Sequence, residues 1–188
     1  MGFGHDERNR NKQWSRAVEL YSATCYSRLV SVTVQARVVA PGSREYLEAA
    51  WELKERIRED EALLKQRRGF FADAYQRSTV HVLLDGPDGD LVGFTAARRD
   101  GYILFLAIEP ERRGEGLGER LVARVAQDAN SVSCHARTDN QNALEFYEHL
   151  GFDRVRKIEN YYEDGGAAFY LKLGDSRLLD KLSDFLRR

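Results

Sequence analysis

Apolar and polar positions alternate in short blocks along the chain, and the blocks switch between a period of two and a helical period. The stretch VSVTVQARVV at residues 30–39 alternates and predicts a strand. A turn follows, and Ser43 is placed to cap a helix over residues 44–59. Apolar residues recur in that helix at helical spacing, namely Leu47, Ala50, Trp51 and Ile57. A second helix is expected from Glu61 to Tyr75.

The middle of the chain predicts a hairpin and a central strand. STVHVLL and LVGFTAAR flank the turn formers DGPDGD, which is typical of an antiparallel hairpin. GYILFLAIEP is almost continuously apolar, so we expect this strand in the middle of a sheet. Further elements are expected in the order helix, strand, helix, strand, strand, at residues 117–125, 131–137, 142–152, 155–164 and 167–173.

This order predicts an α/β layer fold with a mixed, mostly antiparallel sheet flanked by helices. The chain has 188 residues and is 43% hydrophobic, which suits a single domain and is short for two. We expect that domain over residues 31–173. Residues 1–30 are interpreted as an N-terminal extension of unknown role and residues 174–188 as a C-terminal helix.

Charge and cysteine content narrow the class of protein. Lys and Arg number 29 against 30 for Asp and Glu, so the net charge of −1 gives no overall attraction to nucleic acid or membrane. Cys25 and Cys134 form no paired motif, which predicts neither a metal site nor a disulfide framework. No apolar run approaches the roughly 20 residues that span a bilayer. We therefore expect a cytoplasmic protein whose affinity for anions is local.

Such local affinity is suggested by RRGEGLG at residues 112–118. Glycines leave backbone N–H groups unshielded just before a helix, where the positive end of the helix dipole lies, and this arrangement can bind phosphate. A P-loop would need a Lys–Ser or Lys–Thr pair after the glycines, and a dinucleotide-binding fold would need GxGxxG after an early strand. The sequence has neither, which leaves another phosphate seat or a glycine turn without a ligand.

Two motifs together resemble the GNAT superfamily of N-acetyltransferases. RRGEGLG is similar to the family's Q/R-R-x-x-G-x-G/A, and DNQNALEFYEHLGF is similar to its N-x-x-A-x-x-x-Y-x-x-x-G-F. The resemblance covers roughly residues 31–173 and implies a GNAT-like fold and acetyl-CoA as the acetyl donor. It implies that the donor is held by a strand segment, the glycine turn and the second motif, at Leu106, Ala107, Ile108, Arg112, Arg113, Gly114, Glu115, Gly116, Leu117, Gly118, Asn140 and Tyr147.

The resemblance also assigns chemistry to the second motif. Tyr147 is expected beside the thioester sulfur as the acid that protonates the departing thiolate, although without the motif it would be interpreted as a core aromatic. Asn140 is placed to cap the helix that carries Tyr147, to bond the cofactor, or to do both. An amide at about Ile108 is expected to polarise the thioester carbonyl.

His135 is the candidate base. In SVSCHAR, Cys134 and Ala136 fall on one face of a strand, and His135 and Arg137 fall on the other. Ribosomal-protein alanine N-acetyltransferases, a GNAT branch, carry a glutamate base at this place, so the histidine is a departure. Its ordinary pKa near 6.5 suits a base working near neutrality. The alternatives are a water relay and a structural histidine.

The acceptor is suggested by NYYEDGGAAFYLKL, which resembles the YY-x-D-G-E-D-A segment of protein N-terminal acetyltransferases. That likeness implies that Tyr161 and Tyr162 line the peptide site, while Gly166 and Ala167 replace the usual acidic pair. The expected activity is acetyl transfer to the α-amine of a protein or peptide. A small-molecule amine acetyltransferase and a non-catalytic acyl-CoA-binding module remain as alternatives, and the oligomeric state is left open.

Overall fold

The computed structural model describes residues 34–87 and 89–173, and those from Val34 onward belong to one compact unit. The expected extension over residues 1–30, the start of the first strand and the C-terminal helix over residues 174–188 lie outside the described residues.

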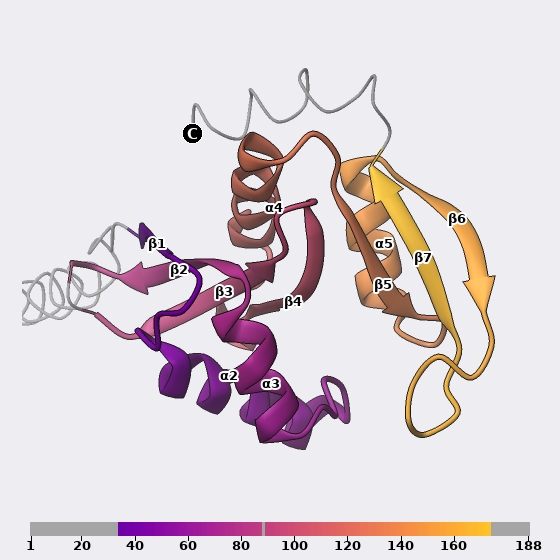
Figure 1. Cartoon of the computed structure of the whole chain (residues 1–188), viewed down its shortest axis with the longest axis horizontal. Coiled ribbons are helices and arrows are strands. Elements are labelled where there is room, and N and C mark those ends of the chain that lie inside the picture. The colour runs from indigo at the N-terminus through magenta and orange to yellow at the C-terminus, as the bar shows by residue number, and fades with distance from the viewer. Residues whose placement is uncertain (1–33, 88, 174–188) are drawn as a thin grey trace, which may run out of the picture. The chain divides into compact units, whose positions relative to one another are not determined.

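The described part of the chain forms one seven-stranded sheet in the order β1-β2-β3-β4-β5-β7-β6 (Figure 1). Neighbouring strands are antiparallel except for the parallel pair β4 and β5, which confirms the mixed, mostly antiparallel sheet. β4 is the fourth of seven strands, as its apolar sequence predicts. The strands are β1 (Val34–Val39), β2 (Thr79–Asp85), β3 (Leu91–Ala97), β4 (Tyr102–Ile108), β5 (Ser133–Arg137), β6 (Phe152–Ile158) and β7 (Ala168–Leu173).

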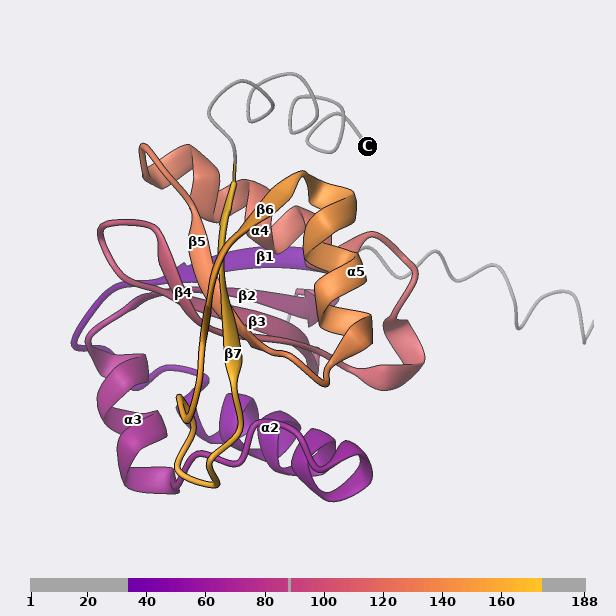
Figure 2. The ribbon, with the colours of Figure 1, turned by 90° about the vertical axis from the view of Figure 1, so that its right-hand side faces the viewer.

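Helices cover both faces of the sheet (Figure 2). One hydrophobic cluster joins α2 (Leu47–Glu61) and α3 (Arg68–Gln76) to the first four strands. Two further clusters join α4 (Leu117–Asp128) and α5 (Gln141–Leu150) to the opposite face. A short 3-10 helix, η1 (Pro110–Arg112), leads from β4 toward α4. The expected order of helices and strands is confirmed.

Three boundaries predicted from the sequence are wrong. Ser43 does not cap α2: its hydroxyl accepts from the Glu45 N–H at 3.1 Å within a turn, and the helix begins at Leu47 after Tyr46 in a left-handed conformation. Glu61 is the last residue of α2, so the second helix begins at Arg68 and the residues between form a loop. The Ser43 hydroxyl bonds within a local turn instead of capping the helix. Such turns compete with helix capping for serine side chains.

The third wrong boundary lies near the end of the chain. The predicted strand over residues 155–164 is instead the end of β6, which stops at Ile158, followed by a loop over residues 159–167. Inside this loop the Tyr162 N–H donates a hydrogen bond to the Gly166 carbonyl at 3.0 Å. The two tyrosines of the motif therefore lie on a loop and not on a strand.

Strand β4 carries an irregularity that positions the site. Ala96 of β3 pairs with Phe105 and Ala97 pairs with Ile103, which leaves Leu104 as an extra residue in β4. Such a bulge shifts the alternation of side chains. Consequently Ile103 packs in the cluster with α4 and α5, whereas Phe105 packs in the cluster with α2 and α3.

Candidate active site

A pocket of about 880 Å³ lies where β4 and β5 separate. The two strands pair only at Tyr102 with Ser133 and at Ile103 with Cys134, so among the described residues no strand pairs with the rest of β4 on that side. Residues 104–108 of β4 and residues 134–137 of β5 line the pocket. The unpaired backbone N–H and C=O groups of β4 therefore face a space in which a ligand can bond to them.

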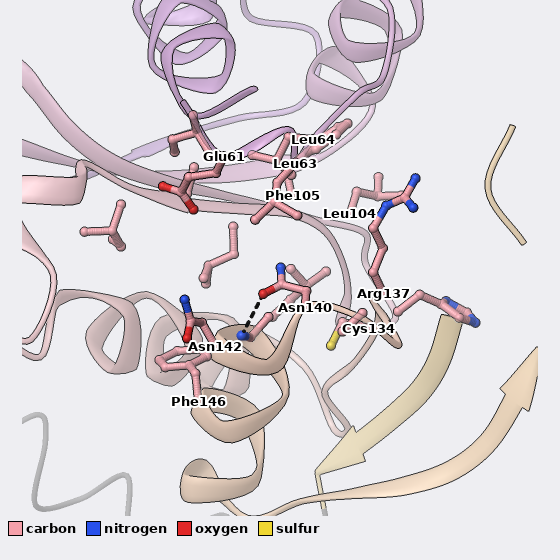
Figure 3. A pocket seen from close by; sticks show the side chains of 18 of the residues that line it. Glu61, Leu63, Leu64, Leu104, Phe105, Cys134, Arg137, Asn140, Asn142 and Phe146 are labelled. Atoms are coloured by element: carbon pink, nitrogen blue, oxygen red, sulfur yellow. Dashed lines mark hydrogen bonds between the residues drawn. The ribbon is translucent and has the colours of Figure 1, made fainter. Parts of the chain in front are cut away.

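The residues that line the pocket form two opposite sides of it. The glycine-turn side comprises the glycine turn, of which residues 112–114 and 117–119 line the pocket, together with the start of α5. The two-loop side comprises the α2–α3 loop (residues 62–67), the β6–β7 loop (residues 159–167) and Phe70 beside them. Residues 63–67 and 161–164 of these loops line the pocket. In Figure 3, Leu63 and Leu64 lie near Phe105 on one side, and Asn140, Asn142 and Phe146 lie on the other.

The glycine turn delivers an uncapped helix start to the pocket. Gly114 and Gly116 have φ angles of 80° and 77°, which favour glycine, and Gly116 immediately precedes α4. No side chain caps α4 in the described part of the chain. The first N–H groups of the helix, including those of Leu117 and Gly118, thus lack intrahelical acceptors. Their position at the positive end of the helix dipole favours an anion.

The two arginines of the turn are paired with carboxylates. Arg112 contacts Glu115 at 3.0 Å and Asp85 at 3.5 Å, and these partners raise the pKa of its guanidinium. Arg113 contacts Glu61, at the end of α2, at 2.7 Å. An anion on the glycine turn therefore competes with Glu61 for Arg113.

The start of α5 approaches the same turn. Asn140 caps α5 by accepting from the Ala143 N–H at 3.1 Å, as expected, and also lines the pocket (Figure 3). A Cβ added to Gly118 would lie 2.9 Å from the Phe146 ring. Glycine at position 118 therefore allows α4 and α5 to pack closely beside the pocket.

Tyr147 lies in the core and also lines the pocket. The residue is 7% exposed, and its hydroxyl has the Cys134 thiol as a neighbour. Burial, together with the neighbouring Cys134, raises the pKa of Tyr147 well above its ordinary value. Burial also raises the pKa of the Cys134 thiol to about 12. Both groups are therefore protonated and uncharged at neutral pH.

His135 lies on the opposite face of β5 from Cys134, as strand alternation predicts. Its Nδ1 is 2.5 Å from the Tyr102 hydroxyl, which is in turn 3.2 Å from the Tyr161 hydroxyl. The imidazole stacks on the Tyr161 ring with centroids 4.3 Å apart, and Tyr170 packs beside it. Nε2 of His135 is buried and has no hydrogen-bond partner among the described residues.

Burial of the imidazole, assisted by the positive charge of Arg156, lowers the pKa of His135 below its ordinary value of 6.5. Burial, together with the bond to Tyr161, raises the pKa of Tyr102. At neutral pH the pair therefore consists of a neutral imidazole and a neutral phenol, so His135 is free to accept a proton.

Ion pairs connect the two loops on the two-loop side of the pocket. Asp164 accepts hydrogen bonds from Arg137 at 2.7 and 2.8 Å and from Lys65 at 3.0 Å. These bonds hold the pKa of the Asp164 carboxyl well below its usual range, and the bond with Arg137 has the largest effect. The Arg137 guanidinium also lies 4.1 Å from the centre of the Tyr162 ring. The α2–α3 loop, the β6–β7 loop and β5 therefore meet at one carboxylate.

Most residues expected at the site from the sequence lie around this pocket. Those that line it are Leu106, Ala107, Ile108, Arg112, Arg113, Gly114, Leu117, Gly118, His135, Asn140, Tyr147, Tyr161 and Tyr162. Glu115 and Gly116 do not line it. The Glu115 carboxylate binds Arg112, and Gly116 supplies the left-handed turn before α4.

Sequence reasoning missed Tyr102 and the α2–α3 loop. Tyr102 reaches His135 at the start of β4, where the strands pair, and no local pattern identifies that contact. Leu63 and Leu64 line the pocket from a loop where the sequence predicts a helix. The described residues contain no cluster of metal-ligating side chains, and none of their helices is long and apolar enough to cross a bilayer.

Comparison with known proteins places these features in a family. Residues 43–152 match the model of the acetyltransferase (GNAT) family. The chain is 39% identical over 80 residues to N-alpha-acetyltransferase 30 of Xenopus laevis, covering 40% of this chain and 29% of that protein. It is 33% identical over 97 residues to N-alpha-acetyltransferase RimI of Mycobacterium tuberculosis, covering 47% and 61%. The match thus spans less than a third of the length of the Xenopus protein.

The fold agrees with that of a solved acetyltransferase. Chaetomium thermophilum Naa20, crystallised with a bisubstrate analogue, has a TM-score of 0.62 and 20% identity, with coverage of 79% of this chain and 90% of that one. At this identity the likeness concerns the fold. The family match covers more than half of the chain and includes the glycine turn, the separated strands and α5, and on these grounds the chain belongs to the acetyltransferase (GNAT) family.

Proposed function

We propose that this protein is an acetyl-CoA-dependent N-acetyltransferase that acts on the α-amine of a protein or peptide. The observation that carries the proposal is the pocket between β4 and β5, with an anion-binding helix start on one side and an uncharged histidine on the other. The relatives named N-alpha-acetyltransferase support the choice of amine.

The residues present fit acetyl-CoA. The uncapped start of α4, with open space above Gly114, suits the pyrophosphate, and Arg113 can turn to it from Glu61. The unpaired backbone of residues 104–108 suits the amides of the pantetheine arm. Acetyl-CoA supplies the acetyl group as a thioester, and the Ile108 N–H is our candidate for bonding its carbonyl oxygen.

His135 is the proposed base. In the tautomer protonated at Nδ1, the ring donates to the Tyr102 oxygen and the Tyr102 hydroxyl donates to Tyr161. Nε2 then has a free lone pair. When the acceptor displaces the aromatic rings that bury this atom, Nε2 accepts the proton of the attacking amine, directly or through one water. Tyr102 and Tyr161 act as positioning residues that set this tautomer and hold the ring.

Tyr147 is the proposed acid. Its hydroxyl lies on the α5 face of β5, away from His135, so the two groups serve opposite ends of the reaction. As the nitrogen–carbon bond forms and the carbon–sulfur bond breaks, Tyr147 donates a proton to the sulfur. His135 releases the proton of the amine to solvent, Tyr147 regains a proton from solvent, and the acetylated amine and the free thiol leave.

An α-amine is the easier acceptor on physical grounds. Its pKa is about 7.7–8.0 against about 10.4 for lysine, so the neutral amine costs roughly 3 kcal/mol less at pH 7. The alternative of a small-molecule amine is favoured by one observation. Ion pairs such as Lys65–Asp164 join the two loops beside the pocket and restrict the opening of this side to a peptide.

The test is an acceptor panel with acetyl-CoA. It contains a peptide with a free α-amine, the same peptide with a blocked N-terminus and an internal lysine, and a small diamine. Thiol release and the mass gain of one acetyl group should be seen with the free α-amine. Turnover of the diamine alone would favour the small-molecule alternative, and binding of acetyl-CoA without turnover of any acceptor would favour a non-catalytic module.

A further inference from the structure

Lys54 of α2 is fully buried, and it is the only buried Lys, Arg, Asp or Glu side chain in the described part of the chain. A buried ammonium group is costly unless charged or polar partners replace its water. The partners of Lys54 therefore indicate what the buried charge does.

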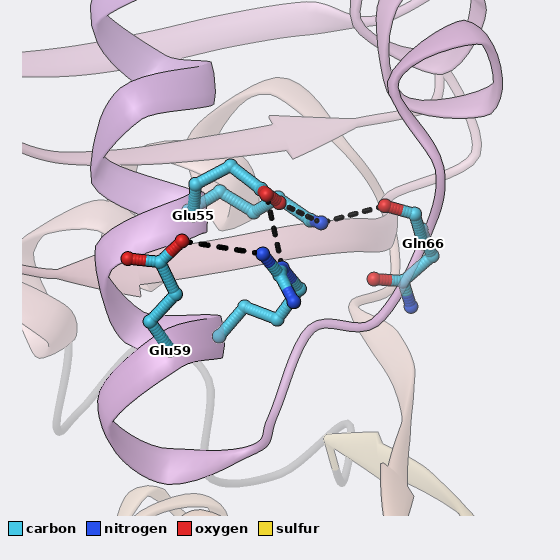
Figure 4. A network of polar contacts seen from close by, with 5 residues as sticks. Glu55, Glu59 and Gln66 are labelled. Atoms are coloured by element: carbon cyan, nitrogen blue, oxygen red, sulfur yellow. Dashed lines mark hydrogen bonds and ion pairs between the residues drawn. The ribbon is translucent and has the colours of Figure 1, made fainter.

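Three groups surround the ammonium of Lys54. It donates to the backbone carbonyl of Gln66 at 2.6 Å and to Glu55 Oε1 at 2.9 Å, and it lies 4.4 Å from the centre of the Trp51 ring. Glu55 is held in turn by Arg58 at 2.9 Å (Figure 4). Because Glu55 and Trp51 belong to α2 itself, the bond to Gln66 is the one that reaches another segment.

That segment is the α2–α3 loop of the pocket. Its residues Ala62 and Leu64 have φ angles of 55° and 53°, a left-handed conformation that residues other than glycine rarely adopt. The loop therefore needs contacts that hold it in this shape. Its ion pairs among the described residues, Lys65 to Asp164 and Arg67 to Glu163, are solvent-exposed and are screened by salt.

The loop presents apolar side chains to the pocket. Leu63 and Leu64 pack against the α2–α3 cluster and line the two-loop side with Phe70, Leu104 and Phe105. The side-chain oxygen of Gln66 is buried there without a hydrogen-bond partner among the described residues. This wall can bury an apolar group of an acceptor.

We infer that Lys54 is a positioning residue that selects the acceptor. Through the Gln66 carbonyl it holds Leu63 and Leu64 as an apolar wall, and this wall favours peptides whose first residue has a large apolar side chain over those that begin with alanine. The inference rests on the proposed function. Lys54 does not contact the reacting atoms, so its effect falls on the acceptor and not on acetyl-CoA.

The experiment compares two peptides that differ only in a first residue of leucine or alanine. The wild-type protein should prefer the leucine peptide by about tenfold in kcat/KM, the lower end for a few methylenes in an apolar pocket. Lys54→Met keeps the length and apolar stem of the side chain but frees the loop. It should raise KM for the leucine peptide by about tenfold and abolish the preference, with the Kd of acetyl-CoA and kcat unchanged.

The matched control is Lys157→Met, which removes an exposed pair at 2.7 Å between Lys157, near the end of β6, and Glu159, the first residue after it. Neither residue is among those that line the pocket, so this variant should leave the preference intact. A second variant tests the same inference if Lys54→Met folds poorly. Leu64→Gly relieves the left-handed backbone while deleting one side chain of the wall, so it should fold and reduce the preference at least threefold.

The outcomes separate the two proposals. Acetylation of both peptides with a preference unchanged in Lys54→Met and Leu64→Gly overturns the selective wall and leaves the proposed function standing. A wild-type protein that prefers alanine also overturns the wall. No acetylation of any peptide overturns the proposed function, and the wall with it.

Discussion

The glycine-turn side and the two-loop side of the pocket are built in opposite ways. The first uses backbone groups of a turn and a helix start, close together in the sequence. The second uses side chains of segments far apart, as in the contact of Lys65 with Asp164, 99 residues along the chain. On the proposed function, the donor meets a site fixed by local conformation and the acceptor meets one fixed by long-range contacts.

This difference suggests how each side tolerates change. A backbone site depends on which residues can adopt its dihedral angles, so it constrains glycine positions strongly and other side chains weakly. A side-chain site can be altered by substitutions in either loop without disturbing the other side. Substitutions on the glycine-turn side should therefore change the Kd of acetyl-CoA, and substitutions on the two-loop side should change the kinetic constants for the acceptor.

The largest effect is expected for Tyr147→Phe. The ring keeps its packing and only the hydroxyl is lost, so kcat should fall about 100-fold, the lower end for acid catalysis, while the Kd of acetyl-CoA and KM for the acceptor stay near wild type. Steady-state kinetics and calorimetric titration of acetyl-CoA measure these constants. Wild-type kcat in the variant would assign Tyr147 to the core alone.

The next effect concerns His135 on the two-loop side. Protonated His135 cannot act as a base, so kcat/KM should decline as pH falls through its lowered pKa, with a midpoint below pH 6.5. His135→Ala should reduce kcat/KM by up to about 100-fold at neutral pH, the lower end for base catalysis, and remove this limb, with the Kd of acetyl-CoA unchanged.

The ionisation of the acceptor can produce a limb of its own, so acceptors of different pKa must be compared. A limb that follows only the acceptor and persists in His135→Ala would remove the histidine from the mechanism. Tyr102→Phe provides a finer control, because it deletes the partner of Nδ1 and should move the limb without abolishing it.

A smaller effect is expected for Gly116→Ala on the glycine-turn side. Its φ of 77° makes a Cβ costly by about 1–2 kcal/mol, although open space surrounds the position. Relaxation of the turn should raise the Kd of acetyl-CoA about tenfold, equivalent to about 1.4 kcal/mol. Acceptor preference should not change.

Gly42→Ala is the matched control. Gly42 has a φ of 91°, also lies in open space, and is not among the residues that line the pocket. In a denaturant titration, Gly42→Ala should lower the free energy of unfolding by about as much as Gly116→Ala does. It should leave the Kd of acetyl-CoA unchanged. An equal rise of Kd in both variants would mean that the turn has no specific role in binding.

The sequence by itself determined the order of strands and helices, the central position of β4 and most residues of the glycine-turn side. Periodicity, turn formers and glycines act over a few residues, so they can be read locally. The opposite directions of Cys134 and His135 also follow from local alternation.

Only the tertiary structure decided most of the two-loop side, although a motif indicates Tyr161 and Tyr162. Local signals predict a helix start at Ser43 and another at Glu61. In the structure α2 begins at Leu47 and ends at Glu61, and the loop that follows is bonded to α2 through Lys54 and the Gln66 carbonyl. The bulge at Leu104 and the short pairing of β4 with β5 opened the pocket and brought Tyr102 to His135. Contacts between distant segments depend on register and packing across the whole sheet, and these quantities leave no pattern in neighbouring residues.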